Sequence, residues 1–344
     1  MQMRYLLGLF ALSTVLACKT EPQPVDPPKV TGKIIQKYDD RLDPILGEEV
    51  ALEVLAEGFT WSEGPVWVPE DGGYLLFSDV PEDKIYRWSA DDGSRVYVEP
   101  SGYTGEGTYS REEGSNGLIL DESGRLLLCQ HGNRIVARMQ ASLDAPSSKF
   151  DTLAATWNGK RFNSPNDLCQ SKNGTIYFTD PPYGLPQQAR DTLREIPFFG
   201  VYRLNPDGTV LVIDSTLTRP NGIILSPDEQ TLYVANSDPK RAVWFRYRVN
   251  ADGSVDQRRL FYDATMLAGK DEEPGLPDGM AIDPRGNLFA TGPGGVWIFA
   301  PDGTALGKIR TGRATANVTF DSDFRHLYIT ADDQLQRVAL PVGR

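Results

Sequence analysis

The stretch SPNDLCQSKNGTIYFTDPPYG, Ser164 to Gly184, decides the fold because the rest of the chain repeats its layout. Asn166 and Asp167 open a short apolar run, a turn follows at Asn173-Gly174, and a β-branched and aromatic run comes next. That second run ends at Asp180, where two prolines stop it. An Asn-Gly step between two such runs is typical of a β-hairpin. The stretch therefore predicts a hairpin with polar oxygens at two strand ends.

The same layout appears six times along the chain. Each copy begins with an acid or amide side chain before an apolar run, and a second run follows after a turn. The six opening residues are Glu63, Asn116, Asn166, Asn221, Asp278 and Asn317. By subtraction, the intervals between them are 53, 50, 55, 57 and 39 residues. Short strands repeated at such a period indicate an all-β fold, a six-bladed β-propeller with one blade per repeat.

The two ends of this repeat region predict how the propeller closes. Residues 50–57, VALEVLAE, alternate like a strand but precede the first opening residue. The last repeat offers one more strand, LQRVAL, before the chain ends. Because propellers avoid open sheet edges, we expect the N-terminal strand to complete the sixth blade. The propeller is then expected to span residues 48–344.

The first 47 residues indicate an export signal and a lead-in. Arg4 precedes a short apolar run that is too short to span a bilayer. The run ends in VLAC, which resembles the signal of bacterial lipoproteins with Cys18 as the lipidated residue; an ordinary signal peptide is the alternative. We expect a lipoprotein signal peptide at residues 1–18 and a Pro-rich linker and lead-in at residues 19–47. In the lipoprotein resemblance, Lys19 rather than Asp after the Cys implies anchoring to the outer membrane of a Gram-negative cell envelope, on its periplasmic side or at the surface.

Composition excludes several classes of function. The 35 Lys and Arg residues are outnumbered by 47 Asp and Glu, so the net charge is −12 and nucleic-acid binding is disfavoured. The sequence contains no Walker loop, dinucleotide fingerprint or G-x-S-x-G elbow. Cys129 and Cys169 fall within strand patterns, and we expect both to be unpaired and buried. We expect a monomer that meets a membrane only through Cys18.

The six opening residues predict a metal site. The first strand of each propeller blade lines the central channel, so these residues should form a ring there. The ring holds two carboxylates and four carboxamides but no His, Cys or Lys. An all-oxygen set suits a hard divalent metal, Ca²⁺ best, whereas zinc is disfavoured. Asn-Gly and Asp-Gly are also common in turns, but six polar residues in one phase favour a central metal site.

Two long insertions interrupt the repeat, at residues 100–115 and 181–199. Long loops on a rigid scaffold are often functional. The second insertion starts directly after Asp180, at the end of the channel toward which the opening residues project. We interpret it as a lid over the channel mouth rather than as part of the core.

Several motifs between Ser62 and Asp283 resemble those of the SMP-30/gluconolactonase family. They are SEGPVW, GSNGLILD, CQHGNRIV, FNSPNDL, IYFTDPPYG, RPNGIILSPDEQTLYVANS and LPDGMAID. The resemblance implies a six-bladed propeller with one catalytic divalent metal, often Ca²⁺, that hydrolyses a sugar lactone to its open-chain acid. It implies the metal ligands Glu63, Asn166, Asn221 and Asp278. Asn116 and Asn317 are not usual ligands in that family, which leaves them for contacts with substrate or water.

Lactone hydrolysis needs a group that takes a proton from water while the metal polarises the carbonyl. Asp278 is the first candidate, although a metal-bound carboxylate is a weak base. Glu63, His131 and Asp180 are the alternatives; His131 and Asp180 stand at predicted strand ends near the mouth and have ordinary structural explanations as well. Tyr183 is a candidate for stacking on the substrate or for packing its loop.

Two other functions stay open at the level of sequence. A phosphotriesterase of the diisopropyl-fluorophosphatase type resembles this family in its Glu-Asn-Asn-Asp metal set. An anchored propeller could instead bind a ligand without catalysis. Buried polar groups need bonding partners, and a metal ion would be the partner of this ring, so the lactonase is favoured over a binding module.

Overall fold

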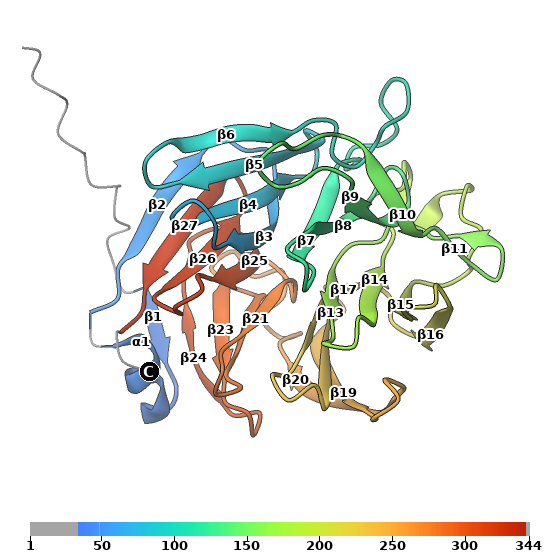
Figure 1. The fold of residues 1–344 in the computed structure, drawn as a ribbon. Coiled ribbons are helices and arrows are strands. Elements are labelled where there is room, and N and C mark those ends of the chain that lie inside the picture. The colour runs from blue at the N-terminus through green and yellow to red at the C-terminus, as the bar shows by residue number, and fades with distance from the viewer. Residues whose placement is uncertain (1–33, 48, 342–344) are drawn as a thin grey trace, which may run out of the picture.

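Six antiparallel sheets surround one channel in the computed structural model, which describes residues 34–47 and 49–341. The innermost strands of the six sheets contact one another in a closed ring, β3–β7–β13–β17–β21–β25 and back to β3 (Figure 1). A closed ring of radial sheets is a β-propeller. The six-bladed propeller predicted from the repeat is therefore confirmed.

Four of the sheets use four strands that follow one another in the sequence. The first holds β3 (Ser62–Val68), β4 (Tyr74–Asp79), β5 (Lys84–Ser89) and β6 (Gly93–Val98). The second holds β7 (Ser115–Leu120), β8 (Leu126–Gln130), β9 (Ile135–Met139) and β10 (Phe150–Ala154), and a small ribbon of β11 (Thr156–Trp157) and β12 (Lys160–Arg161) follows it. The third holds β13 (Leu168–Gln170), β14 (Ile176–Asp180), β15 (Gly200–Leu204) and β16 (Val210–Asp214). The fourth holds β17 (Pro220–Leu225), β18 (Thr231–Asp238), β19 (Arg241–Val249) and β20 (Val255–Asp263).

The last two sheets recruit strands from the N-terminal part of the chain. The fifth holds β21 (Met280–Ile282), β22 (Leu288–Gly292), β23 (Gly295–Phe299) and β24 (Ala305–Ile309), and β1 (Ile35–Lys37) pairs with β24. The sixth holds β25 (Thr315–Phe320), β26 (His326–Ala331) and β27 (Gln334–Ala339), and β2 (Leu52–Glu57) pairs with β27. Each added strand covers a sheet edge.

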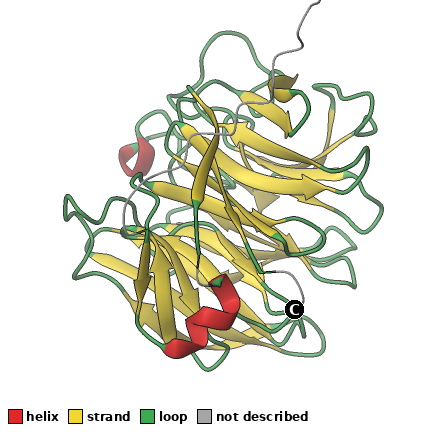
Figure 2. Cartoon of the chain, turned by 90° about the vertical axis from the view of Figure 1, so that its left-hand side faces the viewer, coloured by secondary structure: helices red, strands yellow, loops and turns green. Residues whose placement is uncertain are grey.

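A short helical segment between β1 and β2 also packs on the propeller. It consists of η1 (Asp40–Leu42) and α1 (Asp43–Leu46). Leu42, Ile45 and Leu46 are buried in the core shared by the fifth and sixth sheets. Figure 2 shows the segment against the strands. Part of the predicted lead-in is therefore packed on the blades.

The innermost strands lose their pairing register at the repeated polar residues. In β7 and β17 the ladder skips Asn116-Gly117 and Asn221-Gly222, which makes each pair a β-bulge. Glycine is required because neighbouring blades approach closely: a Cβ on Gly222 would lie 2.1 Å from the carbonyl oxygen of Asp278. These dipeptides are therefore bulges that aim side chains into the channel, not turns.

The insertion at residues 181–199 belongs to the core at both ends. Leu185 is 1 % exposed, and Ile196 is 0 % exposed in a cluster with Phe162 and Phe178. Its middle part carries η2 (Gln188–Arg190) and reaches the surface, where Leu193 is 54 % exposed. The interpretation of this insertion as a lid separate from the core is wrong, because its ends are buried apolar residues.

The predicted signal peptide and Cys18 lie in residues 1–33, outside the residues that the structure describes. Within the described part of the chain, no helix is long and apolar enough to cross a membrane. Cys129 is buried, Cys169 is partly buried, and both are free thiols.

Candidate functional site

Five of the six repeated polar residues meet at one end of the channel. They line a cavity of about 540 Å³ and come from five different blades: Glu63, Asn116, Asn166, Asn221 and Asp278. Their side chains converge because each stands at the beginning of an innermost strand or just before it. This end of the channel is the candidate functional site.

Asn317 does not join this group, so its expected contact with substrate is not supported. In two blades the backbone N–H of the glycine after the opening residue reaches the next blade: Gly117 N donates to Asn166 O at 2.8 Å, and Gly279 N donates to Ala316 O at 2.8 Å. The residue equivalent to Asn166 in the sixth blade is therefore Ala316. Asn317, one residue further along the strand, lines a cavity at the other end of the channel instead.

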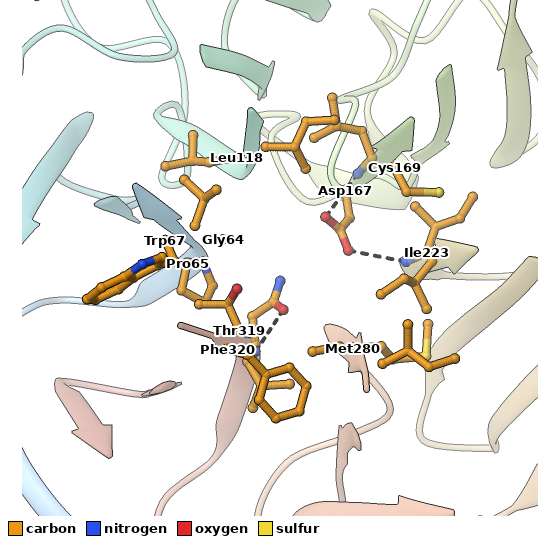
Figure 3. A pocket seen from close by; sticks show the side chains of 18 of the residues that line it. Gly64, Pro65, Trp67, Leu118, Asp167, Cys169, Ile223, Met280, Thr319 and Phe320 are labelled. Atoms are coloured by element: carbon orange, nitrogen blue, oxygen red, sulfur yellow. Dashed lines mark hydrogen bonds between the residues drawn. The ribbon is translucent and has the colours of Figure 1, made fainter. Parts of the chain in front are cut away.

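That other end holds a second cavity, of about 430 Å³. Figure 3 shows its mostly apolar lining, which includes Met280 and Phe320, together with the carboxylate of Asp167. Both oxygens of this carboxylate accept backbone hydrogen bonds, from Leu168 N at 2.9 Å and Ile223 N at 3.2 Å. Burial raises the pKa of Asp167 to about 7. This acid, which the repeat did not single out, holds neighbouring blades together.

Two carboxylates of the candidate site lack a cationic partner. Glu63 is 2 % exposed and accepts hydrogen bonds from Gly64 N at 3.0 Å and from the Trp61 indole N–H at 3.5 Å. Burial raises the pKa of Glu63 to about 8. Burial, and then the neighbouring Glu63, raise the pKa of Asp278 well above its usual range. Glu63 is buried and Asp278 is partly buried, yet among the described residues no Lys, Arg or His nitrogen lies within 4.0 Å of either carboxylate. A carboxylate removed from water ordinarily requires such a partner.

The amide residues form a connected row beside these acids. The amide group of Asn166 lies 3.0 Å from that of Asn116 and 2.5 Å from that of Asn221. Asn221 in turn contacts the hydroxyl of Ser237 at 2.9 Å. All three amides are almost completely buried. The row presents carboxamide oxygens at a fixed place in the ring.

His131 lies behind this row and not in the cavity. Its Nε2 is 3.0 Å from the amide of Asn166, and its Nδ1 is 3.1 Å from the carbonyl oxygen of Glu112. Burial lowers the pKa of His131 to about 4, so the ring is neutral near pH 7. A role as a base that touches water or substrate is not supported, because Asn166 stands between His131 and the cavity.

Asp180 is also placed away from the cavity. One carboxylate oxygen accepts from Ser164 N at 2.7 Å, and the other accepts from the backbone N of Asn163 at 2.8 Å and its side chain at 2.9 Å. Burial raises the pKa of this carboxyl to about 7. Asp180 therefore shapes the loop that presents Asn166, and its expected role as a base is not supported.

Other residues of the cavity were missed from sequence. Tyr183 does line it as expected, and burial raises its pKa. The missed side chains come mainly from the connections between blades: Trp61, Arg111, Glu112, Arg219, Ser237, Lys270 and Glu273. Two of them, Arg111 and Glu112, lie in the insertion at residues 100–115, which is visible in the sequence. The others are single residues that no repeat marks.

Several known proteins are similar to this chain in sequence and fold. A sequence profile described as the SMP-30/Gluconolactonase/LRE-like region matches residues 61–333. A gluconolactonase of Zymomonas mobilis is 41 % identical over 312 residues, which cover 89 % of this chain and 86 % of that protein. A solved gluconolactonase structure from Xanthomonas campestris superimposes with a TM-score of 0.77 at 32 % identity, covering 94 % of this chain and 100 % of that one. A calcium-binding regucalcin from Agrobacterium tumefaciens shares the fold, with a TM-score of 0.64 at 17 % identity over 85 % of this chain and 94 % of that one.

Proposed function

Because this chain belongs to the SMP-30/gluconolactonase family, we propose that it hydrolyses a sugar lactone to the open-chain acid with one divalent metal, Ca²⁺ first among them. The observation that carries the metal is the pair of carboxylates, Glu63 and Asp278, at one cavity without a cationic partner in the described part of the chain. The carboxylates and amides beside them form the oxygen set that Ca²⁺ prefers. The residues present thus fit a hard cation held by Glu63, Asn166, Asn221 and Asp278.

The bound metal would polarise the lactone carbonyl and stabilise negative charge on its oxygen. The chain's own residues must then place the substrate and accept a proton from water. Asp278 is the proposed base, because it lines the cavity while His131 and Asp180 do not. Glu63 is less suited, because its two oxygens already accept from Gly64 and Trp61.

Asn116, Tyr183 and Trp61 are the proposed substrate contacts. All three line the cavity, and the amide of Asn116 can bond a sugar hydroxyl. The rings of Tyr183 and Trp61 offer flat surfaces of the kind that pack against a sugar lactone. They also help to exclude bulk water from the reacting carbonyl, which strengthens electrostatic interactions there.

Hydrolysis of D-glucono-1,5-lactone by the full-length protein, followed by titration of the acid released, tests this function. We expect turnover above the spontaneous rate, its loss with a chelator and its recovery with Ca²⁺. A rate equal to the spontaneous one would contradict the proposal. Hydrolysis of an organophosphate in the absence of lactone turnover would favour the phosphotriesterase instead.

We further propose that the mature protein begins at a lipidated Cys18 and is held at the outer membrane. The motif VLAC at the end of the apolar run is the support. The intact mass of protein isolated from membranes decides this: we expect a chain that starts at Cys18 and carries acyl groups. An unmodified mature chain that starts elsewhere would contradict it.

A further inference from the structure

The protonation of His131 determines which end of the Asn166 amide donates a hydrogen bond to it. The carbonyl oxygen of Glu112 only accepts, so His131 Nδ1, 3.1 Å away, must carry a proton. The imidazole is 0 % exposed, and no carboxylate lies within 4.0 Å of it in residues 34–47 and 49–341, so it carries that proton alone. Nε2 is therefore an acceptor.

The amide of Asn166 must then turn its NH₂ group toward His131. Nε2 lies 3.0 Å from this amide, and only the NH₂ end can donate to it. A rotation of 180° exchanges the oxygen and the NH₂ group of an amide, and the hydrogen-bond partners determine which orientation is correct. The oxygen of Asn166 consequently faces Asn221. If the amide of Asn116 is also rotated by 180°, its oxygen accepts a hydrogen bond from the NH₂ group of Asn166.

Asn221 is fixed from the opposite end by Ser237. The Ser237 hydroxyl donates to the carbonyl oxygen of Pro277, which only accepts. Ser237 can therefore only accept from Asn221, whose NH₂ group is 2.9 Å away. The oxygen of Asn221 then faces Asn166, where the two amide atoms are 2.5 Å apart. Two oxygens that face one another with no proton between them are favourable only around a cation.

We infer that His131 and Ser237 are positioning residues that together turn the oxygens of Asn166 and Asn221 toward the metal of the proposed function, on which this inference rests. Neither residue is among the four proposed metal ligands. Partners of this kind orient metal ligands from behind, and their loss weakens metal binding. The inference assigns to His131 a function in place of the catalytic one that the structure does not support.

Calcium titration of the metal-free full-length protein by isothermal calorimetry tests this role. We expect His131→Leu and Ser237→Ala to weaken Ca²⁺ binding by about 10- to 100-fold. His131→Gln keeps a side-chain acceptor and should recover part of the loss. His326→Gln is the matched control, because His326 pairs with Asp321 and neither residue lines the cavity of the candidate site. At saturating Ca²⁺ the turnover of His131→Leu should return toward the wild-type value.

The outcomes separate this inference from the proposed function. Wild-type protein that binds no divalent metal would overturn the proposed metal and the inference with it. Wild-type protein that binds Ca²⁺ while His131→Leu and Ser237→Ala bind it equally well would overturn the inference alone. If His131→Leu does not fold, Ser237→Ala still decides.

The charged side chains of the cavity carry a second inference, from different residues and the same proposed metal. Arg219 is half-buried at the cavity, yet among the described residues no carboxylate lies within 4.0 Å of its guanidinium group. Its backbone is fixed on both sides, since its N–H donates to Asn236 Oδ1 at 2.9 Å and its carbonyl accepts from Ser237 N at 2.9 Å. Half-buried cations ordinarily have an anionic partner.

Two further cations line the same cavity without an ion pair in the described chain, Arg111 and Lys270. Of the cavity carboxylates, Glu273 is already paired with Lys308 and Arg310. With Glu63 and Asp278 neutralised by a divalent metal, Glu112 is the one remaining acid among the lining residues. The mouth is then positive in a protein whose net charge is −12.

We propose that Arg219, assisted by Arg111 and Lys270, is a subsite for a second acidic group, so that the enzyme favours lactones that carry a carboxylate away from the reacting carbonyl. The proposal rests on lactone hydrolysis as the function. D-glucarate and D-gluconate are suitable probes, because they share a carbon skeleton and differ by one carboxylate.

Inhibition of lactone turnover by these two acids measures the subsite. We expect D-glucarate to bind about 10-fold more tightly than D-gluconate at low salt, and the ratio to fall toward one in Arg219→Gln or at high salt. Arg259→Gln, on the exposed outer strand β20, removes the same charge and should keep the wild-type ratio. A ratio near one in the wild type, or one unchanged in Arg219→Gln, would overturn the proposal. If no lactone is turned over, calorimetric binding of D-glucarate still tests the subsite by itself.

Discussion

The two ends of the channel are built by the same innermost strands, yet they differ in chemistry because of a shift of one residue. The upper layer consists of Glu63, Asn116, Asn166, Asn221, Asp278 and Ala316. The layer below it consists of Gly64, Gly117, Asp167, Gly222, Gly279 and Asn317. The upper layer offers oxygens to a cavity, whereas the lower layer is mainly glycine, where neighbouring blades touch.

The two polar residues of the lower layer have a structural explanation. A Cβ on Gly117 would lie 2.5 Å from Asp167 Oδ1, and one on Gly279 would lie 1.9 Å from the side chain of Asn317. Asp167 and Asn317 thus fill the space that an adjacent glycine leaves. Both also bond to backbone N–H groups, including Val318 N at 2.8 Å for Asn317. A buried acid is therefore not a reactive site when its oxygens are already bonded.

The largest expected effect is a loss of turnover on mutation of Asp278, at the polar end of the channel. Asp278→Asn should lower kcat by about 10² to 10⁴ at saturating Ca²⁺, because a ligand oxygen remains while the group that takes the proton is lost. Glu63→Gln removes the same charge and should lower kcat less. Cys169→Ser, at the apolar end, is the control that should keep the wild-type rate. Near wild-type turnover by Asp278→Asn would show that Asp278 is only a ligand.

The sequence predicted the propeller and most of the upper layer because both follow from periodicity. Asn317 was misplaced because it is the polar residue nearest to the expected phase, whereas Ala316, the true equivalent, has no polar side chain to mark it. Asp180 and His131 were taken as candidates because they stand at strand ends near the mouth. Their hydrogen bonds to Ser164 and Asn166 depend on how loops fold back, which sequence spacing does not encode.

The next effect concerns stability at the insertion of residues 181–199. Ile196→Ala should reduce the free energy of unfolding by about 2–5 kcal/mol, because it leaves a cavity in a core where Ile196 is 0 % exposed. Leu193→Ala, at a side chain that is 54 % exposed, should change it by less than about 0.5 kcal/mol. Denaturant unfolding of both variants measures this. Equal stability of the two would restore the interpretation as a lid.

Asp180→Asn should show a structural effect without a chemical one. The substitution turns one acceptor oxygen into an NH₂ group that faces the donors of Asn163 or Ser164, which should cost about 1–3 kcal/mol of stability. At a temperature where the variant is fully folded, kcat at saturating Ca²⁺ should stay within a few-fold of wild type. Unfolding curves and turnover must be measured on the same preparation. A fall in kcat as large as that of Asp278→Asn, with normal stability, would return Asp180 to the list of bases.

The smallest effect is expected from a substitution that tests whether the apolar end takes any part in the reaction. Thr319 on β25 lines the lower cavity and is partly exposed there, so a larger side chain at this position would obstruct that cavity without touching the upper layer. A strand also tolerates an aromatic residue well. If substrate and product pass only through the polar mouth, Thr319→Tyr should change kcat/KM by less than about two-fold, the range of an ordinary substitution away from a site. Steady-state kinetics on the lactone at saturating Ca²⁺ provide the measurement. A clear fall in kcat/KM, with unchanged melting temperature and Ca²⁺ affinity, would mean that the channel is open from both ends and that the lower layer belongs to the path of the substrate.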